Sequence, residues 1–454
     1  MISLRKPYDC PRDVPSQTAR VRSGRPNARV YDGRFWLAFA SNLSTAMAVA
    51  LLFRYADLVS RLGGGEFELG WIVGVGMLGS LVMRFVLGQA IDRHGAGTVW
   101  LVSLAVVSAA CFGHLLLSSC HGPAIYVLRI LYASSIAGVF GSSLTWVGSR
   151  VPRARLAEMV GMLGTSGFVA MGAGTYLGDL LAGGATEAVF IQRLFLVAGS
   201  LTATGMVFCW LATRGPMRQA EPSHASMAKL LWRYSPRFVL LVGVATGVAL
   251  GLPGTFLRTF TAELGIARMA TFFGVYAGAA VITRICARRW PERFGLAPII
   301  LLGLVLLVAG LLSFLLVQAA WQLVIPAVIF GVAHAIVFPP TIAASTLSFP
   351  EHCRGLGTML ILAAYDLGVL IGAPLAGAVV QYSDRFGLPP YPTMFVTMAA
   401  LVGLISVVFS ASLVSHAPAK PATGSGESQS TPAAWAPPAE IDDAEANEEA
   451  LVSR

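Results

Sequence analysis

The sequence predicts an all-α membrane protein in which twelve transmembrane helices form two related six-helix bundles. Composition is the first indication, because 56% of the 454 residues are hydrophobic, only 12% are charged, and the mean hydropathy is +0.70. A soluble domain has roughly half apolar and a quarter charged residues. The second indication is a series of apolar runs long enough to cross a bilayer, and the third is a motif that recurs about 200 residues further along the chain.

Charge and cysteine content exclude several classes of protein. The formal net charge of +9 is interpreted as positive charge on cytoplasmic loops, and a nucleic-acid partner is not expected. The six cysteines are scattered and include no C-x-x-C pair, which fits neither a zinc site nor a disulfide framework. The chain also lacks a phosphate-binding G-x-x-x-x-G-K-[ST] loop and an H-E-x-x-H helix. The sequence therefore predicts no metal, no cofactor and no enzyme.

Changes in composition divide the chain into five parts. A basic, proline-containing arm (residues 1–34) precedes the N-terminal six-helix bundle (35–212). A polar cytoplasmic linker (213–236) leads to the C-terminal bundle (237–414), and an acidic tail (415–454) follows. The arm and the tail are expected to be disordered, because a segment so poor in large apolar residues cannot bury a core.

Each bundle is predicted from six apolar runs of about 20 residues, the length that crosses a bilayer. The expected spans lie near residues 36–58, 69–90, 98–119, 122–147, 157–182, 189–212, 237–260, 270–289, 296–317, 320–346, 356–380 and 392–414. An even number of spans places both termini on one side. Loops on the other side hold few basic residues, namely Arg61, Arg268 and Arg385. The positive-inside rule therefore predicts cytoplasmic termini, in a cell (plasma) membrane protein that we expect to be a monomer.

A short polar turn between the second and third spans is repeated between the eighth and ninth. The first copy reads G-Q-A-I-D-R-H-G and comprises Gly88, Asp92, Arg93 and Gly95, with Arg84 before it. The second copy contains Arg284, Glu292, Arg293 and Gly295. A hinge that returns at half the chain length indicates duplication. Two parallel repeats related by an axis along the membrane normal are one known transporter design, with substrate near the midplane.

These motifs resemble the major facilitator superfamily, whose signature between helices two and three is G-x-x-x-D-R-x-G-R-R. The present chain has Ala96 and Gly97 where two basic residues are usual. The segments H-A-I-V-F-P-P (His334–Pro340) and Y-D-L-G-V-L-I-G-A-P-L-A-G (Tyr365–Gly377) are similar to the arabinose-efflux and drug-efflux-like branch. The resemblance implies alternating access, in which two bundles rock around a central site. The first, fourth, seventh and tenth helices would line the cavity.

Ionisable residues within spans are the candidates for substrate binding or proton coupling, because burying a charge in the bilayer is costly. Asp366, near the middle of span eleven, could take and release a proton, or could form a fixed ion pair that locks the halves together. His334 in span ten titrates near physiological pH in its free form, although a lone histidine is more often a packing residue. Asn42 and Tyr132 are candidate polar contacts with the cavity.

Arg129 occupies the place of the helix-four arginine of the superfamily, and the resemblance implies a role in substrate binding or coupling. Snorkelling of this side chain to the outer surface is the alternative. Arg54 and Asp57, three residues apart on span one, and Arg258 on span seven are candidates for an outer gate. They could also attract an anionic substrate, and ordinary interfacial anchoring is the alternative that the sequence favours. The charges of both hinge copies are interpreted as a conformational switch, because charges at helix ends interact with one another and with helix dipoles.

The leading functional hypothesis is a secondary active transporter of a small organic solute in the lipid bilayer. Proton coupling is expected, and the branch resemblance favours export by an antiporter over uptake of a sugar or carboxylate metabolite. A membrane sensor or enzyme on a transporter-like scaffold is the alternative. A sensor should add a folded soluble domain, and an enzyme should gather polar residues at one depth. Only Asp366 and His334 approach that arrangement.

Overall fold

The structure is a computed structural model, and it describes residues 31–150, 155–214, 234–349 and 354–415. The predicted arm, most of the predicted linker and nearly all of the predicted tail lie outside the described residues. The boundaries of these three segments therefore stay predictions.

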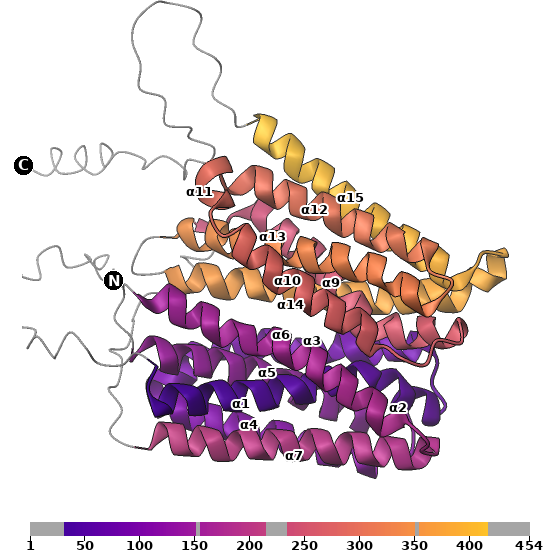
Figure 1. The fold of residues 1–454 in the computed structure, drawn as a ribbon, viewed down its shortest axis with the longest axis horizontal. Coiled ribbons are helices and arrows are strands. Elements are labelled where there is room, and N and C mark those ends of the chain that lie inside the picture. Colours follow the sequence, from indigo (N-terminus) through magenta and orange to yellow (C-terminus); the bar gives the residue numbers. More distant parts are fainter. Residues whose placement is uncertain (1–30, 151–154, 215–233, 350–353, 416–454) are drawn as a thin grey trace, which may run out of the picture.

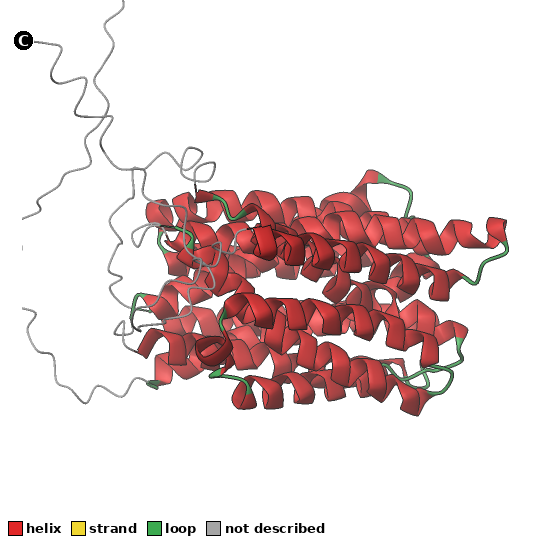
Figure 2. Ribbon diagram, turned by 90° about the horizontal axis from the view of Figure 1, so that it is seen from above, coloured by secondary structure: helices red, strands yellow, loops and turns green. Residues whose placement is uncertain are grey.

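Twelve helices of 17 or more residues make up the described part of the chain (Figure 1). Those of the first half are α1 (Gly33–Leu51), α3 (Glu66–His94), α4 (Ala96–Gly113), α5 (Pro123–Gly148), α6 (Leu156–Ala182) and α7 (Glu187–Thr213). Those of the second half are α9 (Arg237–Glu263), α10 (Ala270–Cys286), α12 (Leu296–Ser313), α13 (Val324–Leu347), α14 (Arg354–Ser383) and α15 (Pro390–Ser415). Figure 2 shows the same helices running roughly side by side.

Short helical segments complete the fold. A 3-10 turn, η1 (Leu52–Arg54), joins α1 to α2 (Tyr55–Arg61), and α11 (Trp290–Phe294) lies between α10 and α12. Further 3-10 turns, His114–Leu116, Phe314–Leu316, Ala320–Leu323 and Asp384–Phe386, lie at helix ends.

The predicted spans are confirmed as helices. Helices such as α3, α7, α9, α14 and α15 extend beyond the predicted spans, whereas α4, α10 and α12 end before theirs. Ten helices of the described chain are long and apolar enough to cross a membrane, and α10 is a shorter apolar helix. The helix α6 has 27 residues and occupies the position of the fifth predicted span. The helix α3 shows why hydropathy shortens a span: it begins with Glu66 and Glu68 and ends with Arg93 and His94. These polar residues belong to the helix, but a prediction that searches for apolar stretches leaves them outside the span.

The helices form two bundles that follow the chain order. Figure 1 shows the indigo-to-magenta helices of the first half gathered below the orange-to-yellow helices of the second half. Within the first bundle α3 packs on α5, and α1 packs on α6 and α7; within the second, α12 packs on α13 and α9 on α14. The start of α1 and the end of α15 lie at the same end of the molecule in Figure 1, which we call the terminal end. The opposite end is called the distal end.

The last glycine of each hinge copy occupies the same conformation. Gly95, between α3 and α4, has φ = 81°, and Gly295, between α11 and α12, has φ = 83°. Side chains strongly disfavour this left-handed region, so glycine is the residue that fits. Each glycine N–H also donates to a carbonyl four residues earlier, Ile91 O at 2.7 Å and Pro291 O at 3.0 Å. The duplication predicted from sequence therefore extends to local backbone geometry.

Close contacts at glycines hold α9 against α14 inside the second bundle. A β-carbon added to Gly247 would lie 2.0 Å from the Tyr365 carbonyl oxygen, and one added to Gly368 would lie 2.1 Å from the Val244 carbonyl oxygen. Lipid provides no hydrophobic drive for helices to associate, so backbones that approach this closely gain van der Waals contact instead.

We therefore expect Gly247→Ala to destabilise the protein by about 1–3 kcal/mol, because the added methyl group meets rigid backbone. Unfolding in detergent, followed by circular dichroism, measures the change. The matched control is Gly278→Ala in α10, where an added β-carbon meets nothing within 4 Å. This control should be neutral or gain up to about 1 kcal/mol, since alanine favours the helix. Equal stability of the two variants would contradict the packing account.

Candidate functional site

Two pairs of helices make the most extensive contacts between the bundles in the described chain, and the internal repeat relates one pair to the other. The helix α3 packs on α14, and α6 packs on α10. Near the distal end, a β-carbon on Gly70 of α3 would lie 2.4 Å from the Ala373 carbonyl oxygen of α14. A β-carbon on Gly172 of α6 would lie 3.7 Å from the Cα of Gly274 in α10. The α3–α14 interface is therefore packed much more tightly at these glycines than the α6–α10 interface.

An ion pair between the bundles lies near the middle of α14. The Arg84 Nε of α3 is 2.5 Å from Asp366 Oδ2, and its Nη2 is 3.1 Å from Asp366 Oδ1. Ser80, one turn earlier on α3, donates its hydroxyl to the same Oδ2 at 2.6 Å. The side chains of Arg84 and Asp366 are only 17% and 5% exposed. The Asp366 carboxylate is thus bound by two groups of the other bundle, the Arg84 guanidinium and the Ser80 hydroxyl.

This contact matches one of the two sequence interpretations of Asp366, the fixed ion pair between halves. It also changes the interpretation of Arg84, which was expected to interact with the other hinge charges and with helix dipoles. Removing one partner of a buried pair typically costs about 3–5 kcal/mol, because the other charge is left without compensation. The pair therefore resists separation of α3 from α14 as long as both groups stay charged.

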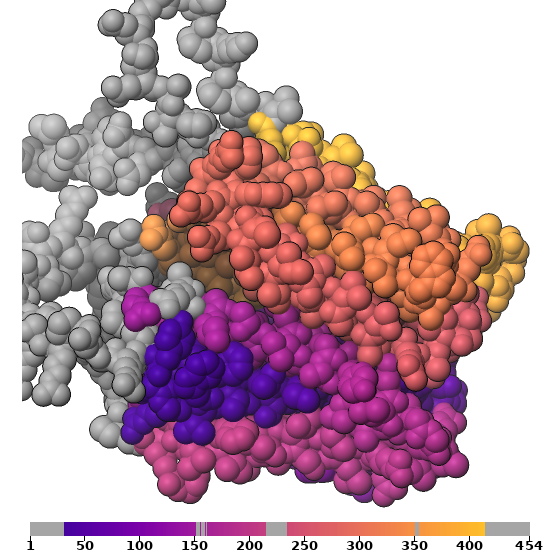
Figure 3. All heavy atoms as spheres, in the orientation of Figure 1, coloured from indigo at the N-terminus to yellow at the C-terminus, as the bar shows by residue number. Residues whose placement is uncertain are grey.

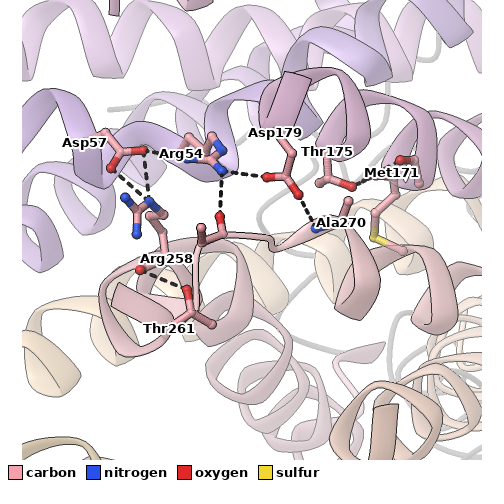
Figure 4. A network of polar contacts seen from close by, with 10 residues as sticks. Arg54, Asp57, Met171, Thr175, Asp179, Arg258, Thr261 and Ala270 are labelled. Carbon is pink, nitrogen blue, oxygen red and sulfur yellow. Dashed lines mark hydrogen bonds and ion pairs between the residues drawn. The ribbon is translucent and has the colours of Figure 1, made fainter. Parts of the chain in front are cut away.

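A second charged network joins the bundles near the distal end (Figure 4). Arg54 of η1 contacts Asp179 of α6 at 2.5 Å and Asp57 of α2 at 3.3 Å. Asp57 also pairs with Arg258 of α9 at 2.9 Å, across the interface. Thus all three residues predicted as an outer gate belong to one network of charges.

Backbone groups of the second bundle complete this network. Arg54 donates to the carbonyl oxygen of Ala267 at 3.2 Å, and the Ala270 N–H donates to Asp179 at 2.9 Å. Phe53 stacks on Phe273 with ring centroids 4.5 Å apart, adding an apolar contact between the bundles. Toward the distal end the surfaces of the two bundles meet, whereas a hollow separates them toward the terminal end on the face seen in Figure 3.

Arg284 is the repeat counterpart of Arg84, but it has a different environment. Its guanidinium lies over the ring of Phe168 from α6, 4.7 Å from the centroid, and its Nε is buried without a hydrogen-bond partner among the described residues. The counterpart of Asp366 is Ser166, whose hydroxyl donates to the Leu163 carbonyl oxygen within its own helix at 2.6 Å. Both duplicated interfaces therefore contain the arginine, but only the α3–α14 interface has a carboxylate at the position opposite it, where the other has Ser166.

His334 lies in a cluster of aromatic side chains at the bundle interface. Its Nδ1 is 2.6 Å from the hydroxyl of Tyr276, and its ring lies against Phe168 and Phe338. Phe338 in turn meets Tyr365 of α14 edge to face. Because Phe168 comes from the first bundle and the others from the second, this cluster joins the bundles by apolar contact, with one imidazole–phenol hydrogen bond inside it.

Arg129 is buried within the first bundle and does not snorkel to the distal surface. It is 8% exposed, and its guanidinium lies 4.4 Å from the ring centroid of Tyr55 and 5.0 Å from that of Tyr132. Its Nε and Nη1 have no hydrogen-bond partner among the described residues, and the same holds for both tyrosine hydroxyls. Cation–π contacts compensate part of the burial cost. Asn42 is also buried, with an unpartnered Oδ1 within the described chain.

The other charges of the hinge copies lie at the terminal end. Asp92 and Arg93 at the end of α3, and Glu292 and Arg293 of α11, are exposed. Gly88 lies in open space, since a β-carbon there would meet nothing within 4 Å. Their proposed role in switching stays a prediction.

The predicted site residues are thus divided among separate places. Arg54, Asp57 and Arg258 come together, and so do Arg84 and Asp366; no contact in the described chain joins Asp366, His334 and Arg129 to one another. Sequence reasoning missed Asp179, Ser80, Phe168 and Tyr276. Asp179 could have been found, because it is a carboxylate near a span end at the same expected depth as Arg54. In the described residues, no group of three or more His, Cys, Asp or Glu side chains could hold a metal ion.

A double-mutant cycle measures the Arg84–Asp366 contact. Arg84→Gln and Asp366→Asn should each lower the free energy of unfolding by about 3–5 kcal/mol, since each leaves a buried charge unpaired. The double variant should lose at least about 1 kcal/mol less than the sum of the single losses. Arg193→Gln, at an exposed arginine of α7, is the control and should change stability by less than about 0.5 kcal/mol. Additive losses would show that the two groups act independently.

Comparison with known proteins gives relatives of one kind. A model of the Major Facilitator Superfamily matches residues 35–315 and 239–443. A putative tartrate transporter of Agrobacterium vitis is 27% identical over 195 residues, covering 40% of this chain and 41% of that protein. The chain thus aligns with about two fifths of the length of that relative. The multidrug resistance protein MdtG of Enterobacter lignolyticus is 23% identical over 77% of this chain and 85% of its own. The staphylopine export protein of Staphylococcus aureus is 22% identical over 76% of this chain and 87% of its own length.

Solved structures show the same fold. The nucleoside transporter NupG superposes with a TM-score of 0.68 at 13% identity, covering 83% of this chain and 98% of that one. A D-xylose–proton symporter gives a TM-score of 0.66 at 14% identity, covering 83% and 97%. With twelve helices in two repeated bundles, and with a family model that matches most of its length, the chain belongs to the Major Facilitator Superfamily of membrane transporters.

Proposed function

We propose that this protein is a secondary active transporter that exports a small organic solute in exchange for protons by alternating access. The observation that supports it best is the chemistry of the bundle interface. Charged networks at two depths, Arg54–Asp57–Asp179–Arg258 and Arg84–Asp366, join the bundles. Charge pairs can break and re-form as groups change partners or lose charge, which suits surfaces that must part during each cycle.

The structure corresponds, in this proposal, to a state closed at the distal end and open at the terminal end. Release of the distal network would let the bundles rock and open the distal end. Interfaces that switch between two packed arrangements behave as bistable elements, and a ligand that binds one arrangement better shifts the balance toward it. The solute and the driving ion would supply that difference in affinity.

Asp366 is the group that we assign to proton coupling. Protonation would remove the negative charge that holds Arg84, and Ser80 would then be the remaining polar contact of the carboxyl group. Binding of a proton would thus loosen the α3–α14 interface. Asp366 can have this role although it is paired with Arg84 in the present structure. His334 and its aromatic neighbours at the bundle interface form the candidate surface for the organic part of the solute.

Direction and orientation are also part of the proposal. Export is supported by relatives named as a multidrug resistance protein and an export protein, whereas the name of the putative tartrate transporter gives no direction. The distribution of Lys and Arg favours a plasma-membrane protein with cytoplasmic termini. The open terminal end would then face the cytoplasm. The transporter is proposed to act as a monomer.

Transport in inside-out vesicles with an imposed pH gradient tests the proposal. The panel contains drugs, amino acids, sugars and small carboxylates. The wild type should accumulate at least one of these solutes in response to an acidic interior. Asp366→Asn should lower that gradient-driven accumulation about tenfold or more, because each 1.4 kcal/mol of lost coupling is a factor of ten.

Glu187→Gln, which neutralises an exposed carboxylate at the start of α7, is the matched control and should transport as the wild type does. Accumulation by Asp366→Asn at the wild-type level would remove Asp366 from the coupling mechanism. Accumulation of the solute in right-side-out vesicles, with no accumulation in inside-out vesicles, would show uptake and contradict the proposed export.

A further inference from the structure

We infer that a cavity at the terminal end of the second bundle binds the headgroup of an anionic phospholipid. The cavity has a volume of about 240 Å³ and is lined by α10, α11, α12 and α13. Ligand pockets that enclose a drug-sized molecule usually measure about 300–1,000 Å³. This smaller space fits a headgroup whose remaining chains lie outside. The site is separate from the proposed transport function, and its test does not depend on transport.

The cavity lies on the opposite side of α13 from the aromatic cluster. Its lining includes Ala335, Ile336, Pro339 and Pro340 of α13. At about 100° per residue, these positions lie on the helix face away from His334. Ile299 of α12 forms another part of the wall. The cavity is therefore mainly a groove bounded by α10, α12 and α13, and Arg284, whose guanidinium lies over Phe168 of α6, connects it to the interface between the bundles.

Positive charge dominates this groove. Arg284, near the end of α10, and Arg288, in the turn between α10 and α11, both line it, and the described lining residues include no acidic side chain. Glu292 of the neighbouring α11 is exposed and is not part of the lining. An anion would therefore meet two guanidinium groups and no opposing carboxylate.

Comparison with the repeat shows that Arg284 has no carboxylate partner among the described residues. In the first copy Arg84 is paired with Asp366, whereas in the second copy Ser166 replaces the acid and Phe168 lies under the guanidinium. The Arg284 Nε is buried without a partner among the described residues. The guanidinium has thus lost hydration at Nε without gaining an acceptor there, so an anion beside the rest of the guanidinium would be bound favourably. Arginine suits a phosphate group in particular, because its planar fork can donate two parallel hydrogen bonds.

The surroundings of the groove indicate a lipid as the source of the phosphate. Large apolar side chains beside it are exposed: Ile282 is 64% exposed, Ile285 66% and Phe294 54%. Trp290, a residue type enriched at membrane–water interfaces, lines the groove itself. A phosphate in the groove would thus have apolar helix surface next to it, where acyl chains can lie. Anionic lipids of the cytoplasmic leaflet are attracted to such juxtamembrane basic groups.

Native mass spectrometry of the delipidated full-length protein in detergent tests this site. Phosphatidylglycerol, phosphatidylcholine with the same chains, and inorganic phosphate are titrated separately, and phosphate is also added as a competitor. One phosphatidylglycerol should bind in preference to phosphatidylcholine. Arg288→Gln should weaken that binding about fivefold, and Arg284→Gln with Arg288→Gln about thirtyfold. These factors correspond to about 1 kcal/mol of electrostatic attraction to an anionic lipid for each arginine.

The matched control is Arg289→Gln with Arg293→Gln, which removes the same charge from exposed arginines outside the lining and should leave the affinity nearly unchanged. Equal losses in the two double variants would indicate diffuse attraction and overturn the site. Equal binding of phosphatidylcholine, or displacement of phosphatidylglycerol by millimolar phosphate, would overturn the anionic-lipid assignment. Should Arg284→Gln fail to fold, Arg288→Gln alone decides the question, because the Arg288 side chain is exposed.

Discussion

A charge within the membrane-spanning part of a protein must have a partner, and this constraint determines how the two bundles meet. A single Asp or Arg at the centre of a transmembrane helix costs about 2.5–3.5 kcal/mol on insertion scales. Here the carboxylate of Asp366 finds its cation in the other bundle, and at the distal end Arg258 of the second bundle pairs with Asp57 of the first. Each bundle carries charges that the other neutralises. Separating the bundles therefore requires that charges change partners, be hydrated or be neutralised by protons.

The duplication gives two similar interfaces that are held unequally. Close contact at Gly70 and the Arg84–Asp366 pair hold α3 to α14. Between α6 and α10, Phe168 lies under Arg284 instead of a carboxylate, and the glycine contact is looser. We expect α6 and α10 to separate more readily than α3 and α14. The serine at position 166 thus has two consequences, a weaker interface and an arginine whose charge is left for a ligand.

Sequence was sufficient to predict the fold because apolar length and internal repetition are one-dimensional signals. The span prediction for 157–182 lies within a residue of α6, and the shared hinge pattern predicted that Gly95 and Gly295 are equivalent. The distal gate was partly predictable for the same reason. Arg54, Asp57 and Arg258 lie at matched depths near span ends, and depth can be counted along the chain.

The partners of Asp366 and Arg129 could not be predicted in this way. Sequence gives the depth of Asp366 but not the direction in which its side chain points around α14, so a fixed ion pair with an unnamed partner and a free, proton-binding carboxylate both fitted. Arg129 was expected to have a substrate or the surface as its partner, and it lies instead between the rings of Tyr55 and Tyr132. Cation–π contacts between helices have no spacing rule that a single sequence reveals. The same is true of Phe168, an ordinary apolar residue until its neighbours are known.

Distances measured at both ends by double electron–electron resonance test the central claim most directly. Spin labels on cysteines introduced at Arg61 and Arg385 report the distal end, and labels at Thr98 and Pro298, all exposed positions, report the terminal end. Weakening the distal network with Asp179→Asn should lengthen the distal distance and shorten the terminal one in the same population. Distances that stay at their wild-type values, or that lengthen at both ends together, would contradict bundles that rock about charge pairs.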